Sequence, residues 1–118
     1  MTPTDAMCRI DALLSHVWMV RTFLKHSEEA QEDEELCDIY RTLYDAMHAL
    51  GGPWKEQDAS AYLKLARKKL GKLQRAAEHF TAIQPDVSAH TNFQMAAASL
   101  GRAVGEISQL LKADVSSE

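Results

Sequence analysis

Two arginine–histidine pairs are the first candidates for chemistry in this sequence. Four residues separate Arg21 from His26, and six separate Arg41 from His48. A histidine can accept and release a proton near neutral pH, while an arginine binds anions through its planar guanidinium. The two pairs are therefore the candidate catalytic residues for chemistry on a phosphate-bearing substrate.

The spacing of these pairs satisfies the loose Arg-x(4–6)-His pattern of HEPN-type helical ribonucleases, which are small helical bundles. The pattern is not specific, because chance alone supplies about one match in a chain of this composition. Each arginine is also followed by threonine, where that family usually has Asn, Asp or His. A HEPN-like ribonuclease or nucleotide-binding module is accordingly the alternative function.

Metal chemistry is disfavoured by where the acidic and histidine side chains fall. The stretch 26-HSEEAQEDEELCDIY-40 holds six carboxylates between Glu28 and Glu35, but it lacks the spaced aspartates and the glycine of an EF-hand loop. Asp45 and His48 imitate a Glu-x-x-His motif, yet the apolar pattern places both on the outer face of a helix. We expect no metal and no cofactor, and we interpret the acidic stretch as a solvated corner between helices.

A strongly basic stretch covers residues 62–79. Its cations fall on heptad positions that cover the outward face of a helix: Lys64, Arg67, Lys68, Lys69, Lys72 and Arg75. Long basic side chains usually form a solvated helix face. The alternatives are a dock for an acidic partner, such as the acidic corner of a second copy, or a contact with phosphate or RNA.

Several large apolar residues lie outside the apolar seams of their helices. These candidate interface residues are Trp18, Met19, Phe23, Leu65 and Met95. Adjacent apolar side chains at outward positions, as in Trp18 and Met19, indicate a patch that another chain covers. The equally weighted alternative is that a wide or tilted bundle buries them.

The elements that must position these residues are predicted from apolar spacing. Steps of three and four recur in four segments, as in helices packed side by side, and no strand-like alternation competes. The predicted helices cover residues 5–28, 33–50, 55–83 and 88–112. Short connections make sequential helices antiparallel, which predicts an all-α, up-down-up-down four-helix bundle forming a single domain over residues 1–118.

Capping residues, glycines and prolines set the predicted helix ends. Thr4 or Asp5 is expected to cap the first helix, and Gly51-Gly52-Pro53 to end the second. Pro85-Asp86 is expected to separate the third helix from the fourth, with Asp86 or Ser88 as the cap of the last one.

Charge and cysteine usage restrict the class of protein. The net charge of −4 disfavours a general nucleic-acid binder, whose domain would normally be basic. Cys8 and Cys37 form no CxxC motif, which is typical of reduced thiols in the cytoplasm. No apolar run approaches the length needed to cross a bilayer, so we expect a soluble cytoplasmic protein without a membrane partner.

Together these observations favour a small non-enzymatic helical-bundle protein. We expect it to act in protein–protein interaction or assembly, as a homodimer or with another protein. This expectation depends on the absence of a catalytic constellation and on the apolar residues at outward positions.

Overall fold

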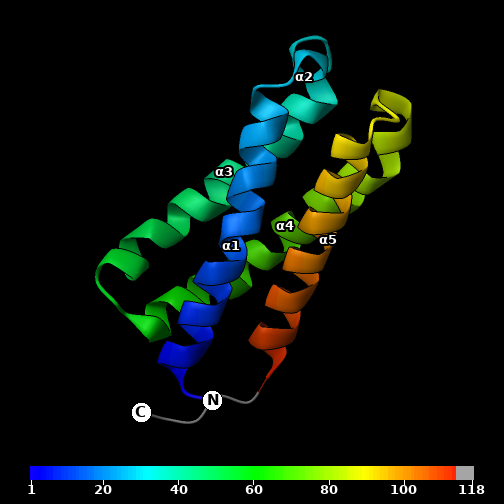
Figure 1. The fold of residues 1–118 in the computed structure, drawn as a ribbon. Helices are drawn as coiled ribbons and strands as arrows, with labels where there is room; N and C mark the ends of the chain where they lie inside the picture. Colours follow the sequence, from blue (N-terminus) through cyan, green and yellow to red (C-terminus); the bar gives the residue numbers. More distant parts are fainter. Residues whose placement is uncertain (114–118) are drawn as a thin grey trace.

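The computed structural model describes residues 1–113, which form five α-helices and no β-strand (Figure 1). The helices are α1 (Pro3–Lys25), α2 (Glu28–Glu32), α3 (Glu34–Lys55), α4 (Ala59–Val87) and α5 (Thr91–Lys112). The prediction of an all-α protein is confirmed. Four of these helices correspond to the predicted ones, and α2 is an additional short helix within the acidic corner.

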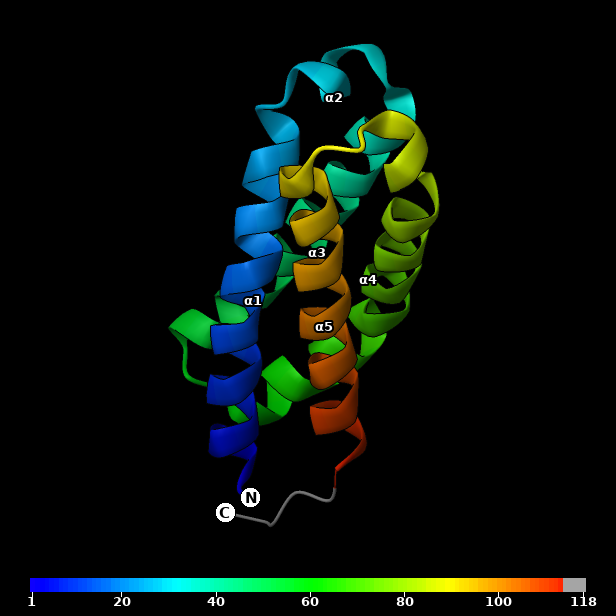
Figure 2. The same ribbon diagram turned by 45° about the vertical axis from the view of Figure 1, so that its right-hand side comes forward.

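The four long helices lie side by side in an elongated body of 47 × 22 × 18 Å (Figures 1 and 2). Helix α1 packs against α3 and α5, and α4 packs against the same two helices. The start of α1 and the end of α5 lie at one end of the body, and α2 lies at the other (Figure 1). The acidic corner therefore covers one end of the molecule.

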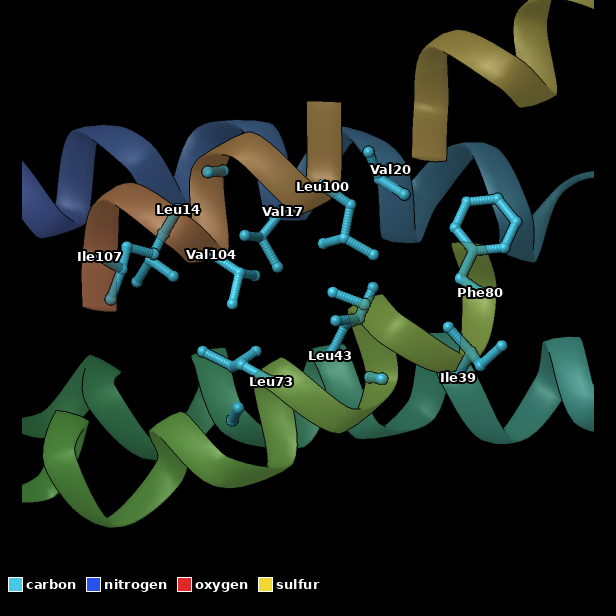
Figure 3. Close-up of a cluster of buried hydrophobic side chains, with 14 of the residues drawn as sticks. Leu14, Val17, Val20, Ile39, Leu43, Leu73, Phe80, Leu100, Val104 and Ile107 are labelled. Atoms are coloured by element: carbon cyan, nitrogen blue, oxygen red, sulfur yellow. The ribbon is translucent and has the colours of Figure 1, made fainter. Parts of the chain in front are cut away.

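The core consists of apolar side chains contributed by all four long helices. Figure 3 shows them pointing toward one another between the helices, among them Val17, Leu43, Leu73 and Leu100. Such side chains repeat every three or four residues, so each helix turns one apolar stripe inward. Burial of these stripes is the main driving force for packing the helices together.

Helix α1 starts at Pro3, two residues before the predicted start. The hydroxyl of Thr2 accepts a hydrogen bond from the Asp5 backbone N–H at 3.1 Å, and Asp5 Oδ2 accepts one from the Thr2 N–H at 3.3 Å. This is a capping box, so Thr2 is the cap in place of Thr4 or Asp5. Hydrogen bonds from the backbone and side chain of Thr2 lower the pKa of Asp5.

The acidic corner is held by its own caps. Ser27 Oγ accepts from the Ala30 N–H at 3.2 Å and starts α2, and Asp33 Oδ1 accepts from the Glu35 N–H at 2.9 Å and starts α3. Ala30 is buried, and the Cys37 thiol donates to its carbonyl oxygen at 3.1 Å. These contacts tie the corner to α3, while α1 ends at Lys25, before the predicted residue 28.

The prediction that Gly51-Gly52-Pro53 ends the second helix is wrong. Helix α3 continues to Lys55, because neither glycine adopts a positive φ. The helix ends instead in a Schellman motif, in which the Gln57 N–H donates to Trp54 O at 3.0 Å and the Asp58 N–H donates to Pro53 O at 2.9 Å. Gln57 occupies the left-handed position of this motif with φ 52°.

The predicted break at Pro85-Asp86 is also displaced. Helix α4 runs through Pro85 to Val87, and the side chain of Gln84 donates to Ser88 O at 2.8 Å across this last turn. A proline near a helix end removes only one backbone hydrogen bond. His90 caps α5 in place of Asp86 or Ser88, since its Nδ1 accepts from the Asn92 N–H at 3.0 Å.

Candidate functional site

Exposed aromatic and methionine side chains lie together where α1 meets α3. Trp18 is 45% exposed, Met19 is 66% exposed and Tyr44 is 36% exposed. The ring centroids of Trp18 and Tyr44 lie 6.4 Å apart, which places the two side chains in contact across the helices. We refer to Trp18, Met19, Arg21, Tyr44 and His48 as the Trp18 face.

Arg21 is held between the two aromatic rings of this face. Its guanidinium carbon lies 4.9 Å from the Trp18 centroid and 4.7 Å from the Tyr44 centroid, which are cation–π distances. Its Nε is enclosed and has no hydrogen-bond partner. Within residues 1–113 Arg21 makes no hydrogen bond or ion pair, and Nε is its only fully enclosed nitrogen.

The α3 side of the face is a column of ring side chains. The His48 ring stacks on Tyr44 with centroids 5.6 Å apart and an angle of 15° between the planes. One turn before Tyr44, a side-chain hydrogen bond with Cys37 raises the pKa of Tyr40, while the charges of Arg41 and Arg21 lower it. The Arg21 charge therefore acts electrostatically on α3.

A shallow groove continues the face along α1. It is lined by Asp11, Leu14, Ser15, Trp18, Met19 and Met47. At its end, Asp11 Oδ1 accepts a hydrogen bond from the hydroxyl of the buried Tyr62 at 3.1 Å, which links α1 to α4. Burial raises the pKa of Asp11, and the bond from Tyr62 offsets part of this effect. Burial likewise raises the pKa of Tyr62.

The other predicted interface residues do not join this face. Phe23 is partly buried and packs edge-on against Phe93, with centroids 4.9 Å apart. Leu65 is partly buried against the core. Met95 is 59% exposed on α5, but within the described chain it shares no groove or ring contact with Trp18. The exposed predicted residues thus fall on two different helices.

The predicted arginine–histidine pairs are not brought together in the described part of the chain. His26 is the exposed residue that follows α1, Arg41 is exposed on α3, and no hydrogen bond or shared groove joins either pair. Instead Arg21 and His48, one from each pair, contact the same Tyr44 ring. The sequence singled out Arg21 for its distance to His26, whereas the helical neighbour that matters is Trp18, three residues earlier.

The six predicted basic residues all lie on α4, where Lys69 is partly buried and the other five are exposed. Lys69, Lys72 and Arg75 line a groove between α3 and α4 that also contains Asp38 and Asp45. Because the helices bring carboxylates opposite these cations, an anion in this groove would also meet negative charge. The three others lie outside this groove on α4: Lys64, Arg67 and Lys68.

His79, which lines the groove between α3 and α4, makes a side-chain contact with the acidic corner that becomes an ion pair when the imidazole is protonated. His79 Nε2 lies 2.6 Å from Glu35 Oε2, and both side chains are largely exposed. Glu35 belongs to the acidic corner, so one of the corner's six carboxylates already has a partner within the chain. Exposed pairs of this kind contribute little to folding stability, about 0 to 1 kcal/mol.

No other feature assigns a chemical role to the described residues. Residues 1–113 contain no cluster of three or more His, Cys, Asp or Glu side chains that could hold a metal ion, and none of their helices is long and apolar enough to cross a membrane. No protein-family model, curated protein or solved structure matches this chain. The Trp18 face must therefore be interpreted from its own contacts.

Proposed function

We propose that this chain is a small non-enzymatic protein that acts in protein–protein interaction or assembly, by pairing with a second copy of itself through the Trp18 face. The observation that carries the proposal is the exposure of Trp18 beside Met19 and Tyr44. Single exposed apolar residues are ordinary, whereas a contiguous aromatic and methionine patch is typical of an interface. Tryptophan, tyrosine and arginine are also the types that dominate interface energetics.

The proposal includes an antiparallel up-down-up-down bundle in a single domain over residues 1–118. The short connections between sequential helices support this topology. Neighbouring helices would then hold the Trp18 face rigid, so that little conformational freedom is lost on association. The free thiols of Cys8 and Cys37 suit a reducing compartment, and we assign the protein to the cytoplasm on that ground.

A second copy is the partner that we favour because the chain carries complementary surfaces. The acidic corner is exposed at one end of the molecule, and unpaired cations lie on α1 and α4. Identical chains most often associate as closed two-fold dimers, in which each complementary contact occurs twice. The apolar centre would supply most of the affinity, and the charges would mainly set orientation and association rate.

Sedimentation equilibrium tests the proposal directly. Trp18→Ala should weaken association by about 2 kcal/mol or more, because a large aromatic side chain is removed from the centre of the interface. Met19→Ala should also weaken it, whereas the matched control Met95→Ala, with a similarly exposed methionine on α5, should have a smaller effect. A wild-type chain that is monomeric at tens of micromolar would contradict the proposal.

The alternative function is a HEPN-like ribonuclease or nucleotide-binding module. One observation favours it, namely that Arg21 and His48 contact the same exposed tyrosine ring. Incubation of the protein with a mixed-sequence RNA tests this alternative, with the double variant Arg21→Ala, His48→Ala as the control. Cleavage by the wild type that the double variant lacks would replace the interaction proposal.

A further inference from the structure

We propose that Arg21 is the anchoring residue of the Trp18 face and that it binds the carboxylates of the acidic segment Glu28–Glu34 of a second copy. This inference rests on the proposed function, since it names the contact through which two copies recognise each other. The proposed contact is a guanidinium–carboxylate ion pair beside an apolar patch.

Arg21 lacks the partner that its charge requires. Its Nε is enclosed without a hydrogen bond, and no carboxylate of residues 1–113 pairs with its guanidinium. Partial burial of a charge is unfavourable unless hydrogen bonds or an opposite charge compensate it. The two aromatic rings compensate part of this charge, and the terminal nitrogens, which are not fully enclosed, leave room for an anion from another molecule.

The geometry of the face favours a carboxylate. A guanidinium presents a planar fork that matches the two oxygens of a carboxylate, so the bond fixes orientation as well as charge. Stacking on Trp18 and Tyr44 restricts Arg21 before the partner arrives, which lowers the entropy lost when the bond forms. Trp18 and Met19 are exposed beside it and would supply the apolar part of the same interface.

The acidic segment of a second copy presents such carboxylates. Glu28, Glu32 and Glu34 are exposed and make no ion pair in the described chain, whereas Glu35 is engaged by His79. Glu28 and Glu32 are four residues apart on α2, so they lie on one face of that short helix. The segment is therefore a preformed pair of acceptors.

The position of Arg21 allows this contact to be made twice. Arg21 lies four residues before the end of α1, at the end of the molecule that α2 covers (Figure 1). A two-fold axis between Arg21 and α2 brings each arginine to the partner's acidic segment. The same arrangement places both Trp18 side chains within the interface.

Charge reversal in mixed dimers tests the inference. Arg21→Glu and the double variant Glu28→Lys, Glu32→Lys should each raise the dimer Kd by at least about tenfold, because like charges then face each other. In an equimolar mixture of Arg21→Glu with the Glu28→Lys, Glu32→Lys variant, the mixed dimer should have a Kd within about threefold of the wild-type dimer. One of its two contacts is then native, and in the other both charges are reversed. The double variant Glu78→Lys, Glu106→Lys is the control: it changes the net charge by the same amount as Glu28→Lys, Glu32→Lys, but on α4 and α5. It should leave the Kd nearly unchanged.

The outcomes separate this inference from the proposed function. If Trp18→Ala dissociates the dimer but the mixture is no tighter than either variant alone, the ion pair is wrong and the interface stands. If the wild type is monomeric, both proposals are wrong. Circular dichroism checks the fold of each variant, and Arg21→Gln replaces Arg21→Glu if the helical signal is lost. When Arg21→Gln is combined with Glu28→Lys, Glu32→Lys in one chain, it should then cause no further loss of dimer affinity, because both changes remove the same contact.

Discussion

At the residue scale, the partly buried carboxyl group of Asp11, which accepts a hydrogen bond from Tyr62, makes a pH-dependent contribution to stability. Tyr62 is fully buried and its hydroxyl donates to Asp11 on the neighbouring α1. Burial raises the pKa of Asp11 above its ordinary value of 3.8, so the folded protein holds this proton more tightly than the unfolded chain. The contribution of Asp11 to folding stability is therefore greatest below pH 3.8 and decreases as the pH rises through the raised pKa.

Asp11→Asn should remove this loss of stability. Its amide oxygen can still accept the hydrogen bond from Tyr62, while the side chain no longer ionises. The variant should gain stability relative to wild type between about pH 3 and neutral pH. Urea unfolding at the two pH values measures the effect, and a difference between variant and wild type that does not change with pH would contradict it.

Residue types alone could not have revealed the Trp18 face completely. The apolar pattern placed Trp18 and Met19 outside the core, and both are exposed. The role of Arg21 depends on its contact with Tyr44, which lies on α3 and is distant from Arg21 in the sequence. Contacts between helices distant in sequence depend on their rotation and register, which the spacing within one helix does not specify.

At the element scale, the existence of the long helices could be predicted more accurately than their ends. Periodic apolar residues determine which segments are helical, and all four predicted segments are. Helix ends depend on single capping contacts, and several residue types can supply them. Gly51 and Gly52 resemble a helix stop, yet α3 continues to Lys55 and ends where the N–H groups of Gln57 and Asp58 form the Schellman bonds.

Gln57→Gly should stabilise the protein by about 1 kcal/mol, because a left-handed φ is unfavourable for any residue with a Cβ. The glycine loses the hydrogen bond from Gln57 Nε2 to Trp54 O, which offsets a small part of this gain. Gln57→Ala is the control, since it loses the same bond and keeps the unfavourable φ. Thermal unfolding should rank glycine above wild type and alanine below it, and equal gains from both variants would refute this explanation.

At the scale of the whole molecule, stability depends on one shared core. Leu43 is fully buried among side chains from the other helices, whereas Leu70 is only partly buried (Figure 3). Both leucines follow the three- and four-residue apolar spacing of their helices, and this spacing does not distinguish them. The difference depends on how closely the neighbouring helices approach each position, which becomes known only when the helices are packed.

Leu43→Ala should destabilise the protein by about 2 to 5 kcal/mol, because it leaves a closed cavity in the core. Leu70→Ala removes the same atoms but should cost less, since water and nearby side chains can fill the space at a partly exposed site. Urea unfolding followed by circular dichroism gives both values. Equal losses for the two variants would show that burial at these positions does not control the cost.

The start of α1 and the end of α5 lie at the end of the molecule opposite α2 (Figure 1). If two copies pair near their α2 ends, this arrangement sends the chain ends of each copy toward opposite poles of the dimer. The starts of the two α1 helices would then lie on opposite sides of the dimer and be held well apart, because each body is 47 Å long.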